Sequence, residues 1–184
     1  MGRCYGLILA CMMLLLVPLS AVAQEMKFPR GSFTLTTDLT YAHTFDDVAD
    51  IPAMQVGFNY FVFDNISIGG ELTGYGVFQE EGDDAVAVGF SLVVRHHFLR
   101  WDRASLFADA SFGPFEANTD VPPTGTRFNY VTRAGLGMTY ELDPDLYLYG
   151  GAHYFHLSNA RLEGVEHNPQ MNGVEFYFGL MWPL

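Results

Sequence analysis

The chain has 184 residues, a length that suits one domain and is sufficient for a complete β-barrel or β-sandwich. Its formal net charge is −12, from 21 acidic against 9 basic residues, which argues against a nucleic-acid-binding surface. An aromatic content of 15% and 19 glycines argue against disorder and favour strands joined by tight turns.

The N-terminal segment has the pattern of an export signal. Arg3 supplies a positive charge, an apolar run extends from Leu7 to Val17, and Ala21-Val22-Ala23 gives the small-x-small pattern that signal peptidase cleaves. We therefore expect a signal peptide over residues 1–23 and a single barrel domain over residues 24–184. No later stretch approaches the roughly 20 continuous apolar residues of a membrane-spanning helix, so no helical anchor is expected.

Both cysteines, Cys4 and Cys11, lie inside this signal segment. A lipoprotein anchor at Cys11 is the less favoured alternative, because most of the apolar run follows Cys11 instead of preceding it. After cleavage of the signal peptide behind Ala23, the mature chain would contain no cysteine, which excludes a disulfide scaffold and a thiolate metal site.

From Ser32 onward, apolar and polar side chains alternate with the period of two that is typical of β-strands. The pattern predicts eight strands, separated alternately by long polar connections and by short turns near Asp64, Trp101 and Pro144. Long loops are expected around Asp46 to Pro52, Gln79 to Asp84, Pro114 to Thr126 and Asn159 to Asn172. The predicted strands lie near residues 32–45, 54–62, 66–73, 86–95, 106–112, 128–140, 146–158 and 174–182.

Each predicted strand has one apolar face and one face of small and polar residues. This pattern describes an all-β fold, an eight-stranded antiparallel transmembrane β-barrel with lipid outside and a polar lumen. Glu71 with Arg95, and Asp109 with Arg133, lie on neighbouring strands and are expected to pair inside a narrow lumen. The alternative is a two-sheet sandwich whose charged face meets solvent. Because such barrels have short periplasmic turns, the long connections are predicted to face the cell exterior.

The stretch His156-Leu157-Ser158-Asn159 carries the candidate chemistry. His156 and Ser158 share one face of a strand, roughly 6.6 Å apart along it, so a base and a hydroxyl nucleophile can meet there. They share this face with Leu146, Leu148 and Tyr154, which is the lipid-facing side. A carboxylate such as Glu175 can serve as the third group that orients the base.

These residues also carry a resemblance to a known family. His156-Leu157-Ser158-Asn159-Ala160 resembles the His-x-Ser-Asn core of the PagL-type lipid A 3-O-deacylases, which are eight-stranded outer-membrane barrels. Asn172-Gly173-Val174-Glu175 is similar to the segment that begins the last strand of that family. The resemblance implies that His156 is the base, Ser158 the nucleophile and Glu175 the orienting carboxylate. It also implies hydrolysis of the ester that joins a 3-hydroxyacyl chain to lipid A.

Two departures from the family pattern bear on the site. Arg161 occupies a position often filled by glycine, and the groups that would bind the oxyanion or orient the substrate are left open among Asn159, Arg161, Asn168 and Asn172. Strict alternation puts Glu175 on the opposite face from Phe176 and Phe178, so that a β-bulge or an early loop position would be needed to bring it to His156. Without one, only a Ser–His dyad remains.

The expected function is therefore that of a carboxylic ester hydrolase acting on lipid A of lipopolysaccharide. The expected location is the outer membrane of a Gram-negative bacterium. No cofactor, metal or nucleic acid is expected, and a homodimer is left open. Two alternatives remain: a non-enzymatic structural or adhesin-type barrel in which His-x-Ser is incidental, and an acyltransferase that passes the acyl group to another lipid.

Overall fold

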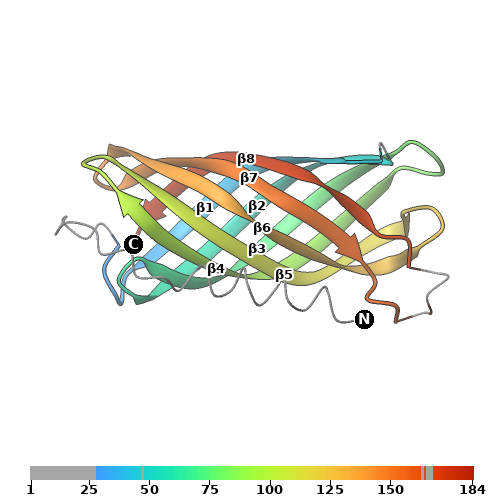
Figure 1. Cartoon of the computed structure of the whole chain (residues 1–184), viewed down its shortest axis with the longest axis horizontal. Coiled ribbons are helices and arrows are strands. Elements are labelled where there is room, and N and C mark those ends of the chain that lie inside the picture. The colour runs from blue at the N-terminus through green and yellow to red at the C-terminus, as the bar shows by residue number, and fades with distance from the viewer. Residues whose placement is uncertain (1–27, 47, 163, 165–167) are drawn as a thin grey trace.

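Eight antiparallel strands close into one barrel in a computed structural model, which describes residues 28–46, 48–162, 164 and 168–184. Each strand pairs with the next along the chain, and β1 pairs with β8 to complete the closure (Figure 1). The strands are β1 (Phe33–Thr44), β2 (Ala49–Phe63), β3 (Ile66–Gln79), β4 (Ala85–Arg100), β5 (Ala104–Val121), β6 (Thr126–Asp143), β7 (Leu146–Ser158) and β8 (Met171–Pro183).

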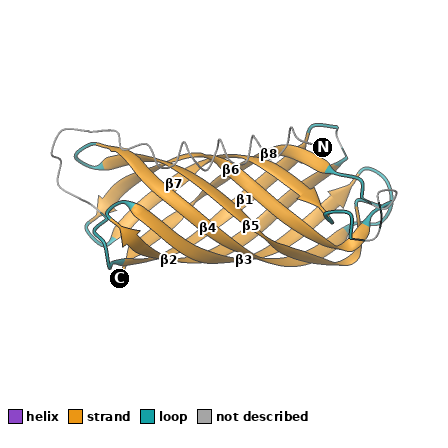
Figure 2. Cartoon of the chain, turned by 60° about the horizontal axis from the view of Figure 1, so that its bottom comes forward, coloured by secondary structure: helices purple, strands orange, loops and turns teal. Residues whose placement is uncertain are grey.

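The all-β transmembrane barrel predicted from the alternation is confirmed, and the sandwich alternative is wrong. Figure 2 draws the described residues as strands and loops alone, and within those ranges no helix is long and apolar enough to cross a membrane. The predicted signal peptide of residues 1–23, with Cys4 and Cys11, lies outside the described residues.

Burial along the strands is inverted relative to a soluble protein. Large apolar side chains such as Leu39, Leu92 and Phe178 are more than 60% exposed on the outer face, where lipid would cover them. Polar side chains such as Thr36, Asn59 and Arg133 are at most 1% exposed, because they point into the lumen. The two faces alternate residue by residue, so the parity of a position decides its surroundings.

Two of the predicted loops are shorter than expected because the strands continue through prolines. Pro52 lies inside β2 and Pro114 lies inside β5. The β2–β3 register has no partner for Pro52, and the β4–β5 register has none for Pro114, although each proline pairs with its other neighbour. A proline, which has no backbone N–H to donate, is tolerated where a ladder is interrupted on one side.

Charged side chains form a layer in the middle of the lumen. Arg95 forms an ion pair with Asp109 at 2.9 Å and lies 4.0 Å from Glu71. Arg133 forms an ion pair with Glu175 at 2.9 Å, not with Asp109 as expected from strand adjacency. The interior is narrow enough for side chains to reach across it, so pairing is not restricted to neighbouring strands.

Apolar clusters lie on both sides of this charged layer. Toward the short turns, Phe61, Phe107 and Tyr147 pack together with Phe28 and Met181. Toward the long loops, the second cluster contains Ala42, Ile51, Val77, Phe115, Val121, Phe155, Leu157 and Met171. The lumen is therefore filled by side chains, which makes the barrel a rigid support for whatever lies on its outer face.

Candidate active site

The last residues of β7 bring a base and a hydroxyl together on the outer face of the barrel. Nε2 of His156 lies 3.0 Å from Oγ of Ser158, and both side chains are half-buried. Their neighbours Phe155 and Leu157 are fully buried in the lumen, so strand alternation directs His156 and Ser158 outward. Ser158 ends β7 at the end of the barrel that carries the long loops.

The other ring nitrogen of His156 contacts Asn172 on β8. Nδ1 lies 2.8 Å from Oδ1 of Asn172, and the same oxygen accepts a hydrogen bond of 2.5 Å from the hydroxyl of Tyr154. His156 and Asn172 are register partners, which puts their side chains on one face. Asn172, considered from sequence as an oxyanion donor, thus occupies the position expected for the carboxylate.

Glu175 does not reach His156. Its side chain is 2% exposed and points into the lumen, where it binds Nε of Arg133 and lies 3.0 Å from Nδ1 of His153. The other ring nitrogen of His153 contacts Asp109 at 2.9 Å. The expected contact between Glu175 and His156 is absent because β8 keeps its strict alternation, without the bulge that would turn Glu175 outward.

A tight turn follows Ser158 and contains Asn159 and Arg161, two of the candidates for binding the oxyanion or orienting the substrate. The amide of Leu162 donates to the carbonyl of Asn159, and Ala160 and Arg161 have φ angles of 55° and 66°. Positive φ at both central residues defines a type I′ turn, which costs non-glycine residues some strain. The amide of Arg161 donates to Oδ1 of Asn159 at 2.9 Å, so this amide is already engaged.

Asn159 and Asn168 hold this turn against the long β7–β8 loop. Asn159 is 2% exposed, and its side-chain amide donates to Oγ1 of Thr126 at the start of β6. Its backbone amide donates to Oδ1 of Asn168 at 2.9 Å. Asn159 is therefore a buried structural residue. The side-chain oxygen of Asn168 accepts this hydrogen bond, so its NH2 group is the part of the side chain that can donate to another partner.

Aromatic side chains flank the His156–Ser158 pair on both sides. Tyr130 is the register partner of Ser158 on β6, and its ring lies 5.2 Å from that of Phe112 and 5.2 Å from that of Phe128. On the other side, the ring of Tyr154 lies 6.3 Å from that of Phe45. The surface around the hydroxyl of Ser158 is thus apolar and suited to acyl chains.

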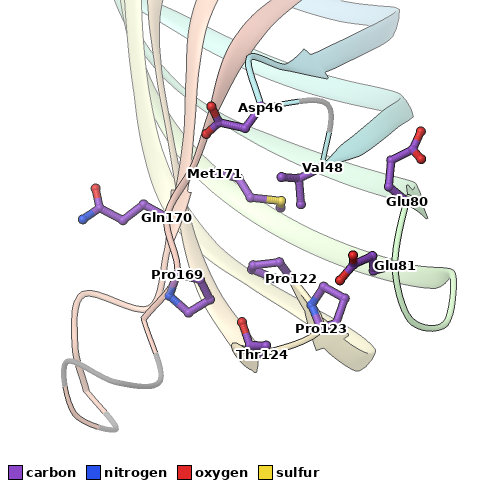
Figure 3. Close-up of a pocket in the computed structure, with 10 residues that line it drawn as sticks. All are labelled: Asp46, Val48, Glu80, Glu81, Pro122, Pro123, Thr124, Pro169, Gln170 and Met171. Atoms are coloured by element: carbon purple, nitrogen blue, oxygen red, sulfur yellow. The ribbon is translucent and has the colours of Figure 1, made fainter.

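A separate pocket lies between the long loops at the mouth of the barrel (Figure 3). It has a volume of about 390 Å³ and is lined by acidic and proline side chains together with Met171. Met171 has the opposite parity to Asn172, so the pocket lies on the other side of β8 from His156. Within the described ranges, no group of three or more His, Cys, Asp or Glu side chains could hold a metal ion.

The family model described as lipid A 3-O-deacylase (PagL) matches residues 32–181 of this chain, which is most of its length. The chain belongs to the PagL family. A search of curated protein sequences found no match.

Solved structures that resemble this PagL family member are also outer-membrane barrels. The neisserial surface protein NspA superimposes with a TM-score of 0.62 at 13% identity, covering 82% of this chain and 95% of that one. The outer membrane enzyme PagL gives a TM-score of 0.60 at 15% identity, covering 78% and 97%. Outer membrane protein W of E. coli gives 0.55 at 10% identity, covering 85% and 99%. At these identities the matches show the fold alone.

Sequence reasoning missed how Asn172 and His153 are used in this PagL family member. Asn172 shares its parity with Phe176 and Phe178, so alternation alone predicts that it faces outward beside His156. His153 shares its parity with the buried Phe155, which predicts a lumen position. Glu175 is its register partner on β8, whereas Asp109 lies on β5, two strands away. The contact with Asp109 skips over β6 and is not visible in local patterns.

Proposed function

We propose that the protein removes the 3-O-linked 3-hydroxyacyl chain from lipid A by nucleophilic hydrolysis, with Ser158 as nucleophile and His156 as general base. The observation that carries the proposal is the 3.0 Å contact between Nε2 of His156 and Oγ of Ser158 on the lipid-facing wall. Polar groups on that wall are energetically costly, so their presence there favours a functional role. Family membership supports the substrate class.

The reaction follows from this contact. Nε2 of His156 takes the proton of Ser158 while Oγ attacks the ester carbonyl, and a tetrahedral intermediate forms. When it collapses, the bond to the sugar 3-oxygen breaks and His156 gives its proton to that oxygen. Water, deprotonated by His156, then attacks the acyl-enzyme. The fatty acid leaves and Ser158 regains its proton.

The oxyanion of the intermediate needs hydrogen-bond donors close to Oγ of Ser158. Among the candidates from sequence, Asn168 is the one we propose, because the contact of its oxygen with the amide of Asn159 leaves its NH2 group to donate. The amide of Arg161 is engaged by Asn159, and Asn159 itself is buried, which argues against both.

The location of the pair suits a substrate in the outer leaflet. By the rule that such barrels have short periplasmic turns, the long-loop end of this barrel faces the exterior, where lipopolysaccharide lies. The acyl chain would lie along the apolar strip formed by Phe112, Phe128 and Tyr130, with its ester at Ser158. The homodimer left open by the sequence is not needed for this proposal.

Mass spectrometry of lipid A from cells that express the protein tests the function. We expect lipid A to lose the mass of one 3-hydroxyacyl chain, and we expect no loss with Ser158→Ala or His156→Ala. Unchanged lipid A with the folded wild-type barrel would favour a structural or adhesin-type role. A gain of acyl mass would favour an acyltransferase.

A further inference from the structure

We propose that Asn172 orients His156 in place of a carboxylate and that Tyr154 fixes Asn172. This inference rests on the hydrolase function proposed above. It starts from the one oxygen, Oδ1 of Asn172, that contacts both the imidazole of His156 at 2.8 Å and the hydroxyl of Tyr154 at 2.5 Å.

These two contacts determine which nitrogen of His156 carries the proton. A carbonyl oxygen has two lone pairs and can accept from two donors at once. With Tyr154 donating its hydroxyl proton to Asn172, Nδ1 of His156 supplies the second donor. Neutral imidazole then has its lone pair on Nε2, the atom that faces Ser158, which is the tautomer that a general base needs.

Asn172 is also held firmly by the backbone. It is the register partner of His156 between β7 and β8. Its backbone carbonyl accepts a hydrogen bond of 2.8 Å from the backbone amide of Phe45. Phe45 in turn lies against the ring of Tyr154. The side chain that would orient His156 thus has few other positions to adopt, which keeps the imidazole in a productive position.

A neutral orienting group suits the outer face of a membrane barrel. A carboxylate facing lipid would carry a large desolvation cost, whereas a neutral amide whose oxygen makes two hydrogen bonds carries a much smaller one. The carboxylate of Glu175 is occupied inside the lumen by Arg133 and His153. The resulting Ser–His–Asn arrangement has the same logic as the Cys-His-Asn arrangement of papain-like proteases.

The test compares purified variants refolded in detergent micelles, with hydrolysis of dispersed lipid A followed across pH. Wild type against Ser158→Ala first establishes the function itself. Asn172→Ala is then expected to lower kcat about tenfold with KM little changed, since a single orienting hydrogen bond is lost. Asn172→Asp is expected to keep activity, with the acidic limb of the pH profile moved up by roughly 1 pH unit or more, because a carboxylate favours the protonated imidazole.

Tyr154→Phe supplies the second arm of the test. It should lower kcat about threefold, and the double variant with Asn172→Ala should be no worse than Asn172→Ala alone, because Tyr154 acts through Asn172. Asn118→Ala is the matched control, since Asn118 also lies on the outer face of a strand and its amide oxygen accepts a backbone hydrogen bond from Val86.

Two results would overturn the inference while leaving the function standing. One is an Asn172→Ala enzyme with the kcat and pH profile of wild type. The other is a folded Glu175→Gln enzyme with a greatly lowered kcat and an acidic limb moved to lower pH, because that would make Glu175 the carboxylate that stabilises the protonated His156. An inactive wild type would instead remove the proposed function, and the inference with it.

Discussion

Arg133 and Glu175 form an ion pair of 2.9 Å on the lumen side of the barrel wall, while Asn172, only three positions before Glu175, contacts His156 on the lipid side. Both side chains of the pair are nearly inaccessible. The carboxylate that the family resemblance predicted to orient His156 therefore belongs to the charged layer in the lumen.

Glu175→Gln is expected to destabilise the barrel. The substitution leaves the guanidinium of Arg133 buried without its counter-charge, and such losses cost about 3 kcal/mol or more of unfolding free energy. Urea unfolding in detergent, followed by tryptophan fluorescence, measures the change. Glu80→Gln, in an exposed loop, is the control and should change the unfolding free energy by less than about 0.5 kcal/mol. Equal stability of the two variants would contradict the role of the pair.

Gly137→Ala is expected to overpack the lumen. A Cβ at Gly137 would lie 2.3 Å from the ring of Phe107 and 2.4 Å from the hydroxyl of Tyr177, so the aromatic cluster must shift. Overpacking of this kind costs about 1 to 3 kcal/mol of unfolding free energy. A Cβ at Gly74 meets nothing within 4 Å, so Gly74→Ala should be tolerated in the same unfolding assay. Similar losses for both variants would point to a backbone effect instead of packing.

Ser158 is expected to react with a lipid-linked fluorophosphonate. In the proposed mechanism, His156, whose Nε2 lies 3.0 Å from Oγ, activates this hydroxyl above the other serines of the chain. Intact-protein mass spectrometry should show one adduct, and peptide mapping should place it on Ser158. His156→Ala should slow labelling by at least about 10³-fold, as for other base-deleted nucleophiles. Equal labelling of both proteins would show that His156 does not activate the hydroxyl.

Chelation of divalent ions is expected to leave the reaction rate unchanged. The proposed steps need a base and hydrogen-bond donors but no Lewis acid. The measurement compares initial rates on lipid A dispersed in detergent with and without EDTA, and dispersion keeps the chelator from changing substrate packing. A loss of activity that added Ca²⁺ or Mg²⁺ restores would require a metal-dependent step.

Most of the fold could be predicted from alternation alone. Residues that face lipid and residues that face the lumen differ so strongly in polarity that the period of two is visible along most of each strand, and the short turns then fix the topology. The strand ends were harder. Pro52 and Pro114 look like loop residues, and only the interrupted ladders of the folded barrel explain why they fit within strands.

The site was predicted in part. The positions of His156 and Ser158 on one outward face followed from parity. The partner of His156 did not, because the family resemblance favoured Glu175 although its parity pointed inward. Parity could have assigned Asn172, but the shared oxygen that joins it to Tyr154 depends on the β7–β8 register.

Because inward and outward side chains alternate strictly in β7 and β8, substitutions on the two faces of these strands should have separate effects. Lumen positions such as Phe155 and Glu175 pack inside the barrel, whereas outward positions such as His156 and Asn172 lie on the lipid side, so the two sets of residues can vary almost independently. Stabilising substitutions introduced from the inside should therefore preserve substrate preference. Insertion of a single residue within β7, ahead of His156, would instead turn the outward residues inward and bury the nucleophile in the apolar cluster of the lumen.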